Sequence, residues 1–203
     1  MITIIDYGSG NINAFANVFK RLNIPAKIAR KKEEVSDATK IILPGVGAFD
    51  HVMNTFNKSG LRDEVEKKVL TEKVPVIGIC AGMQILAESS DEGREKGLGW
   101  IDGKVRLFDT SKINFKTKLP HMGWNEIKHE ENLLFKNIAQ GARFYFVHSY
   151  YFECNDEQNS IATTEYGIRF TSAVNSENIY GVQFHPEKSH ENGQQLLFNF
   201  ANL

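Results

Sequence analysis

Short apolar runs alternate with amphipathic stretches along the first half of the chain. The apolar runs have the length of buried strands, and in the stretches between them apolar residues recur with the period of a helix. The strand-like runs lie at residues 2–6, 41–43 and 74–79, and the helical patterns lie at residues 13–22, 52–70 and 83–87. Strands that alternate with helices are typical of βαβ units, so we expect an α/β fold with an open, mostly parallel sheet flanked by helices.

The second half of the chain changes character, because shorter strand-like runs follow one another and turn residues separate them. These runs lie at residues 103–108, 143–152, 160–166, 170–174 and 179–184, and a helical pattern at residues 191–200 follows them. We interpret this half as an antiparallel or mixed extension of the same sheet, within one domain spanning residues 1–203. Ligands of such sheets bind beyond the carboxyl ends of the parallel strands.

Composition narrows the possible partners. The chain has 24 Lys and Arg residues against 25 Asp and Glu residues, which gives no electrostatic reason to expect nucleic acid or an anionic membrane as a partner. Residues 1–6 have a strand pattern instead of a targeting pattern, and no run approaches the length of a membrane span. The two cysteines show no CxxC spacing, so we expect neither disulfides nor a zinc site, and we expect a cytoplasmic protein.

Residues 74–84 carry the most specific chemical signal. An apolar strand runs into Gly78-Ile-Cys80-Ala-Gly82 and then into a helical pattern. This arrangement is typical of a nucleophile elbow, in which flanking glycines allow a sharp turn that exposes the nucleophile at a helix N-terminus. The commoner role of an isolated cysteine is that of a small buried apolar residue, but the two glycines favour the catalytic interpretation. Cys154 has no such setting.

A cysteine nucleophile needs a base and a group that orients the base. His185 stands at the end of a strand-like run, and Glu187 follows it after Pro186. A lone histidine beside a proline is more often a solvated turn residue, yet this histidine alone combines a strand end with a nearby carboxylate. No HxxxH or HExxH spacing indicates a metal site.

Two glycine-containing turns complete the candidate motifs. The turn Pro44-Gly-Val46-Gly47 can present backbone N–H groups to an oxyanion, although such turns usually only connect elements. The turn at residues 8–13 begins like GxGxxG, but Asn13 replaces the third glycine, so dinucleotide binding is not expected.

Together, the motifs at residues 44–47, 78–84 and 185–187 resemble those of the class I glutamine amidotransferase family, in the same order along the chain. The stretches at residues 6–11, 120–125, 144–150 and 181–189 resemble the branch of this family that forms the glutaminase subunits of imidazole glycerol phosphate synthases, enzymes of histidine biosynthesis. The resemblance covers essentially the whole chain. It implies a class I glutamine amidotransferase-like fold and hydrolysis of glutamine without a cofactor.

The resemblance also implies a role for individual residues. Cys80 would be the nucleophile, His185 the proton carrier and Glu187 the residue that orients His185. The implied oxyanion hole consists of Val46, Gly47 and Ala81. The implied substrate-binding residues are Gln84, His148, Ser149 and Tyr150, and the implied partner-facing residues are Trp124, Asn125, Tyr145 and Lys188. The implied partner is a (β/α)₈-barrel synthase or cyclase subunit that receives the ammonia within a heterodimer.

Two residues depart from the family pattern. Ala81 stands where Leu is usual, and Ser9 stands where Met is usual. Since Ala81 acts through its backbone, glutamine hydrolysis is still expected. The alternatives are a related barrel partner in surface-sugar amidation, a cysteine hydrolase of similar architecture, or a catalytically silent partner protein.

Overall fold

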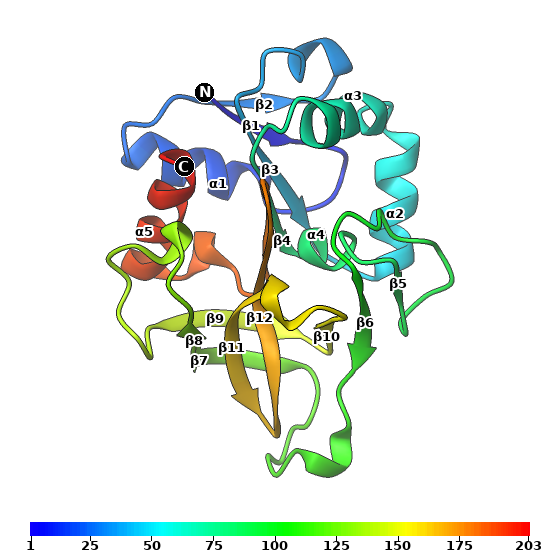
Figure 1. Cartoon of the computed structure of the whole chain (residues 1–203), viewed down its shortest axis with the longest axis vertical. Coiled ribbons are helices and arrows are strands. Elements are labelled where there is room, and N and C mark those ends of the chain that lie inside the picture. The colour runs from blue at the N-terminus through cyan, green and yellow to red at the C-terminus, as the bar shows by residue number, and fades with distance from the viewer.

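An eleven-stranded mixed sheet runs through the computed structural model, which describes residues 1–203 (Figure 1). Its first part is parallel and has the strand order β2, β1, β3, β4, β13. These strands span Ala26–Ala29 (β2), Ile2–Ile5 (β1), Lys40–Gly45 (β3), Val76–Cys80 (β4) and Ile179–Val182 (β13). Strands from both ends of the chain therefore meet at the centre, where β4 and β13 lie side by side.

The sheet becomes mostly antiparallel beyond β13. It continues through β12, β10, β6 and β5, with β11 and β8 branching from β12. These strands span Ile168–Ser176 (β12), Tyr150–Cys154 (β10), Gly103–Leu107 (β6), Ser89–Ser90 (β5), Ser160–Tyr166 (β11) and Lys128–His129 (β8). A separate antiparallel pair joins β7 (His121–Glu126) to β9 (Arg143–His148). The expected fold, a mostly parallel sheet with a mixed extension, is confirmed.

Helices cover both faces of the parallel part (Figure 1). On one face α1 (Ile12–Arg21) and α5 (His190–Ala201) pack over one buried apolar cluster. On the other face α2 (Phe49–Lys58), α3 (Arg62–Glu66) and α4 (Ala81–Gln84) pack over a second cluster. Burial of an apolar stripe on each helix explains why these amphipathic segments are helical here.

Two predicted elements are divided in the structure. The helical pattern over residues 52–70 is split, because α2 ends at Lys58 and Gly60 adopts a φ of +72° before α3 and a π-helical turn at Lys67–Thr71. The run over residues 143–152 forms two strands, β9 and β10, which belong to different sheets and are separated at Ser149. The helix expected over residues 83–87 is the short α4, which starts directly after Cys80.

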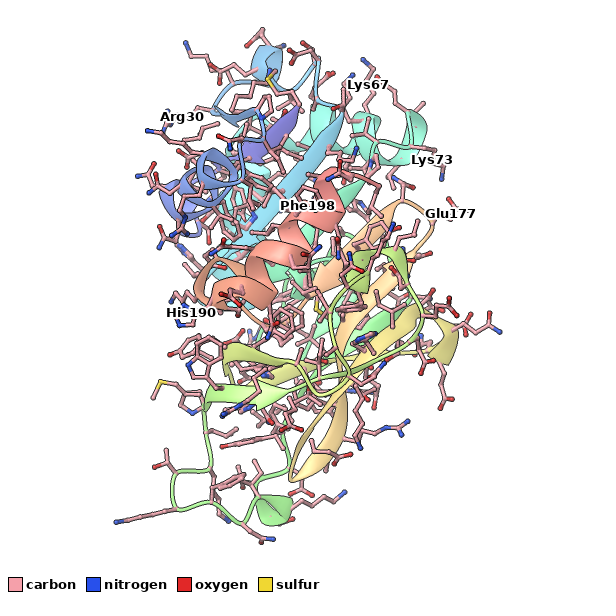
Figure 2. The ribbon with its side chains drawn as sticks, turned by 90° about the vertical axis from the view of Figure 1, so that its left-hand side faces the viewer. Arg30, Lys67, Lys73, Glu177, His190 and Phe198 are labelled. Atoms are coloured by element: carbon pink, nitrogen blue, oxygen red, sulfur yellow. The ribbon has the colours of Figure 1, made fainter.

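An ion pair on the surface connects the first half of the chain to the second half. Lys73, just before β4, lies 2.8 Å from Glu177 in the turn between β12 and β13 (Figure 2). Both side chains are largely exposed, so the pair contributes little to stability. No helix of the chain is both long and apolar enough to cross a membrane.

Candidate active site

Cys80 occupies a sharp turn between β4 and α4. Its φ of +54° and ψ of −114° lie in a region that L-residues rarely adopt. The glycines around it let the backbones approach: a Cβ at Gly82 would lie 2.0 Å from the carbonyl oxygen of Leu43, and a Cβ at Gly78 would lie 2.4 Å from the carbonyl oxygen of Gly82. The turn has the predicted elbow geometry, and it holds Cys80 at the carboxyl end of the central strand.

His185 lies just beyond the neighbouring strand β13, with Glu187 behind it. The His185 Nδ1 atom lies 2.9 Å from Glu187 Oε1, and the two side chains are only 4% and 2% exposed. A carboxylate can only accept, so Nδ1 carries the proton and Nε2 is left for the sulfur side. The backbone is fixed as well, because His185 N donates to the carbonyl of Tyr145 at 2.8 Å and Ser189 Oγ donates to the carbonyl of His185 at 2.6 Å.

Burial and the two neighbours of His185 act in opposite directions on its pKa. Burial lowers this pKa, whereas the Cys80 sulfur and the Glu187 carboxylate raise it, with a net increase to about 10. The Nε2 atom of His185 has no hydrogen-bond partner of normal geometry, yet the nearby Cys80 sulfur still raises the pKa of this histidine. The arrangement therefore favours the imidazolium form of His185.

A pocket of about 370 Å³ opens above Cys80 and His185, a size that suits an amino acid. It gathers Val46, Gly47, Ala81, Gln84, His148, Ser149, Tyr150 and Lys188 from the sequence prediction, together with Glu92, Pro120 and Val147. Segments from both halves of the chain thus form one cavity at the end of the parallel strands.

The predicted oxyanion loop is tied to the first loop of the chain. The Ser9 hydroxyl accepts from the backbone N–H of Val46 at 3.0 Å and donates to the carbonyl of Val46 at 3.0 Å. Gly47 adopts a φ of +100°, which glycine tolerates without strain. The N–H group of Val46 is therefore already engaged, and it can bind an oxyanion only after this hydrogen bond breaks.

Three predicted substrate-binding residues are linked by hydrogen bonds inside the pocket wall. Gln84 Nε2 donates to the carbonyl of Tyr150 at 3.2 Å, and His148 Nδ1 donates to the same carbonyl at 2.7 Å. The other ring nitrogen of His148 lies 3.0 Å from Nδ1 of His121. Both ring nitrogens of His148 therefore face protein groups, and its imidazole is engaged within the wall of the cavity.

The sequence prediction missed three residues of this site. Glu92 lines the pocket and accepts from the N–H group of Phe49, the first residue of α2, at 2.8 Å. Its carboxylate suits a positively charged substrate group. Gln183 is fully buried with its side-chain nitrogen 3.6 Å from the Cys80 sulfur, and His121 contacts His148. Gln183 stands two residues before His185, which was the one available signal.

Comparison with known proteins shows the family to which the chain belongs. The sequence pattern of the family described as "Glutamine amidotransferase class-I" matches residues 3–203. The chain belongs to the class I glutamine amidotransferase family. Two relatives named "Imidazole glycerol phosphate synthase subunit HisH" come from Bdellovibrio bacteriovorus and Leptospira borgpetersenii; they are 54% and 52% identical over 204 residues, with 100% of each chain covered.

Solved structures support the fold of this amidotransferase. One described as "Crystal structure of glutamine amidotransferase" has a TM-score of 0.76 at 21% identity, covering 100% of this chain and 99% of that chain. Another, "Structure of PurLQS from Thermotoga maritima", has a TM-score of 0.73 at 18% identity, with coverage of 99% and 97%.

The four predicted partner-facing residues of the amidotransferase occupy two different settings. Trp124, Tyr145 and Lys188 are contiguous: the rings of Trp124 and Tyr145 are 6.1 Å apart, and Lys188 Nζ lies 5.6 Å from the centre of the Tyr145 ring. Asn125 is turned inward, where its side-chain nitrogen donates to the carbonyl of Glu165 at 2.9 Å. Lys188 also lines the pocket, so this surface adjoins the mouth of the site.

Proposed function

We propose that this amidotransferase is the glutaminase subunit of an imidazole glycerol phosphate synthase and makes ammonia for histidine biosynthesis. The observation that carries the proposal is the pocket above Cys80, with His185 and Glu187 at its base. The full-length relatives named for that synthase support the choice of pathway. The pathway role and the free thiol of Cys80 suit a cytoplasmic enzyme.

The first chemical step transfers the acyl group of glutamine to sulfur. The thiolate of Cys80 attacks the carboxamide carbon, and the resulting oxyanion binds backbone N–H groups of Ala81 and of the reoriented Val46–Gly47 segment. His185 gives its Nε2 proton to the departing nitrogen, the carbon–nitrogen bond breaks, and ammonia leaves. A glutamyl thioester remains on Cys80, and Glu187 keeps the imidazole in position throughout.

The second step releases glutamate. His185 takes a proton from water, and the hydroxide oxygen attacks the thioester carbon. The carbon–sulfur bond breaks with its electron pair returning to sulfur, which restores the thiolate beside the imidazolium. The balance is one glutamine and one water consumed, and one glutamate, one ammonia and one proton formed, the proton coming from the new carboxyl group.

The remaining pocket residues hold the amino-acid end of glutamine in this proposal. Glu92 accepts the ammonium group, because it is the carboxylate of the pocket wall. Gln84, His148, Ser149 and Tyr150 shape the cavity around the substrate. A peptide with a blocked amino group would lose the pairing with Glu92, which disfavours general peptidase activity.

The proposed partner is the (β/α)₈-barrel cyclase subunit of the synthase, docked over the pocket mouth. Ammonia released into water near neutral pH is mostly protonated and no longer nucleophilic, so it has to pass between subunits without release. Exposed apolar side chains near the mouth support such docking: Val46 is 45% exposed, Met122 64% and Trp124 38%. Met122 pairs in register with Val147, a residue of the pocket wall.

Labelling with a glutamine-like diazo-ketone tests the nucleophile. We expect mass spectrometry to find the label on Cys80 and none on Cys154, because burial raises the pKa of the Cys154 thiol to about 12. Cys80→Ser serves as the unlabelled control, and glutamate release identifies the substrate. Label confined to Cys154, or undiminished glutaminase activity in Cys80→Ser, contradicts the proposal.

We also propose that residues 1–203 unfold as one domain. The continuous sheet that joins both halves of the chain supports this proposal. One transition with coincident midpoints by fluorescence and circular dichroism is the expected result in denaturant, and two separated transitions would contradict it.

A further inference from the structure

Gln183 is a buried polar residue beside the reacting sulfur. It follows β13 directly, is 0% exposed, and its backbone N–H donates to the carbonyl of Ser172 at 2.9 Å. Its side-chain Nε2 lies 3.6 Å from Cys80 Sγ. A fully buried amide is costly unless its hydrogen bonds are made, so this contact needs a chemical explanation.

Its neighbours fix which end of the Gln183 amide faces the sulfur. The carbonyl of Tyr150 can only accept, so the Gln84 atom that lies 3.2 Å from it is the nitrogen. The same nitrogen lies 3.1 Å from the Gln183 side chain, so the Gln183 atom at that contact is the oxygen. The NH₂ group of Gln183 is therefore the end that faces Cys80.

We propose that Gln183 donates a hydrogen bond to the thiolate of Cys80 and, together with His185, keeps this sulfur ionised and aimed into the pocket. A hydrogen bond to an ionised acceptor is about twice as strong as one between neutral groups. The amide does not titrate, so it also stabilises the sulfur when the thioester breaks and the thiolate departs. This inference rests on the proposed role of Cys80 as the nucleophile.

Several titratable groups surround the same sulfur and have to be separated from Gln183 in any test. They are His185 with Glu187 behind it, Tyr7 from the loop after β1, and Glu92, His148, Tyr150 and Lys188 in the pocket wall. Of these, His185 acts most directly, because the sulfur and the imidazole form the reacting pair. Gln183 alone among the side chains paired with the sulfur keeps the same charge at every pH.

The rate at which iodoacetamide alkylates Cys80 tests the proposal over a range of pH. The full chain carries Cys154→Ser so that Cys80 is the only thiol, and the variants are Gln183→Met, which lacks the donor, and Gln183→Glu, which keeps an acceptor for Gln84. We expect Gln183→Met to raise the pH midpoint of alkylation by about one unit, the effect of about 1.4 kcal/mol. We expect a larger increase in Gln183→Glu, because a second negative charge faces the sulfur.

The shape of the pH profile distinguishes donation to sulfur from a loosened structure. A thiolate of higher pKa is also a stronger nucleophile. If the midpoint rises by one pH unit, Gln183→Met therefore reacts about threefold more slowly below the midpoint, where less thiolate is present, and about threefold faster above it. A change in access to the sulfur alone instead scales the rate by the same factor at every pH and leaves the midpoint in place. Unfolding midpoints measured in parallel show whether each variant is folded, and Gln183→Glu is close in shape to glutamine if Gln183→Met fails to fold.

Repeating the measurement in a His185→Asn background separates the two donors. A midpoint shift that persists there assigns the effect to the amide, whereas a shift that vanishes means that Gln183 acted only through His185 and overturns the proposal. Unmoved midpoints in both Gln183 variants overturn it as well. A parent chain whose Cys80 reacts like an ordinary thiol contradicts the catalytic role of Cys80 itself, so that failure is distinguishable.

Discussion

Single residues at this site hold conformations and charges that are costly elsewhere in a protein. A positive φ at a non-glycine residue costs on the order of 1–3 kcal/mol and persists only where the surroundings enforce it. At Cys80 the enforcement comes from Gly78 and Gly82, which permit backbone contacts that no Cβ would allow. His185 is held by hydrogen bonds instead, because its ring bonds to Glu187 and its carbonyl bonds to Ser189.

The proposed roles of His185 and Glu187 predict unequal losses on substitution. His185→Ala removes the proton carrier, and we expect the kcat for glutamine hydrolysis to fall by roughly 10²–10⁴-fold. Glu187→Gln keeps an acceptor for Nδ1 and loses only the charge, so a smaller loss is expected. Steady-state glutamate release in the partner complex measures both. Equal losses, or a harmless His185→Ala, would place the base elsewhere.

The hydroxyl of Ser9 makes two hydrogen bonds to Val46, and we expect this latch to hold the proposed oxyanion loop in its present conformation. Ser9→Ala removes both hydrogen bonds to Val46, and a net worth of about 0.5–1.5 kcal/mol per bond, or about 1–3 kcal/mol for the two, corresponds to roughly 5–150-fold in population of the reoriented loop. We expect the basal kcat of the isolated chain to rise by such a factor. Ser9→Thr keeps the hydroxyl and is the matched control. A lower basal kcat in Ser9→Ala than in Ser9→Thr speaks against the latch.

At the scale of elements, the β7–β9 pair connects the proposed partner-facing surface to the pocket through buried histidines. His121 on β7 lies directly opposite His148 on β9, and Asn125 Nδ2 lies 3.2 Å from Nε2 of His121. Burial lowers the pKa of His121 to about 4, and burial and the neighbouring His121 lower that of His148 to about 3. Both rings are therefore neutral at pH 7, which lets each accept one hydrogen bond and donate another.

The lowered pKa values of His121 and His148 predict that the folded chain loses stability in acid. In the unfolded chain both histidines bind a proton below a pKa of about 6.5, whereas in the folded chain they stay neutral to lower pH. Their contribution to stability is therefore complete above pH 6.5, and it is lost as the pH falls toward 4 for His121 and toward 3 for His148. Each group contributes a slope of about 1.4 kcal/mol per pH unit within its window.

His121→Gln removes one titrating group and keeps a hydrogen-bonding side chain. The free energy of unfolding, measured in urea at pH 7 and at pH 5, should fall less between these two pH values in His121→Gln than in the parent chain. His51→Gln, a change at an exposed histidine on α2, serves as the control and should follow the parent. An unchanged pH dependence in His121→Gln would mean that His121 is not buried in the neutral form.

At the scale of the whole molecule, the chain places its chemistry at one end of the sheet and an exposed apolar rim around it. Trp124 stacks on His190 at 5.0 Å with the rings nearly parallel, so its indole is held in place before any partner binds. His190 opens α5, and Phe198 lies farther along the same helix (Figure 2). Trp124 and Phe198 are both exposed aromatics, so they allow a matched comparison.

Trp124→Ala should weaken binding of the proposed barrel cyclase partner by roughly 30-fold or more, the effect of removing a tryptophan hot spot of at least about 2 kcal/mol. Phe198→Ala removes another exposed aromatic side chain away from the pocket, and it should leave the affinity unchanged. Calorimetric titration gives both dissociation constants. Equal effects of the two substitutions would exclude the rim around Trp124 as the docking surface.

The sequence by itself determined the elements whose signal is local. The elbow around Cys80, the strand that ends before His185 and the helix at His190–Ala201 each follow from periodicity and from glycine or proline at a defined position. The resemblance to the amidotransferase family added residues whose own pattern is weak, such as Gln84 and Tyr150. It did not reveal Glu92, which no local pattern marks, or Gln183, whose one local signal is its place two residues before His185.

Only the tertiary structure decided what is held by contacts between distant segments. The strand β7 was not predicted, because His121 and Asn125 are polar and become strand residues only by pairing with β9 and with each other. Residues 143–152 divide at Ser149 because β9 pairs with β7 in the small sheet, whereas β10 pairs with strands of the large sheet. The orientation of the Gln183 amide depends on Gln84 and Tyr150, which are remote in sequence, since a hydrogen bond is fixed by where its partner lies in space.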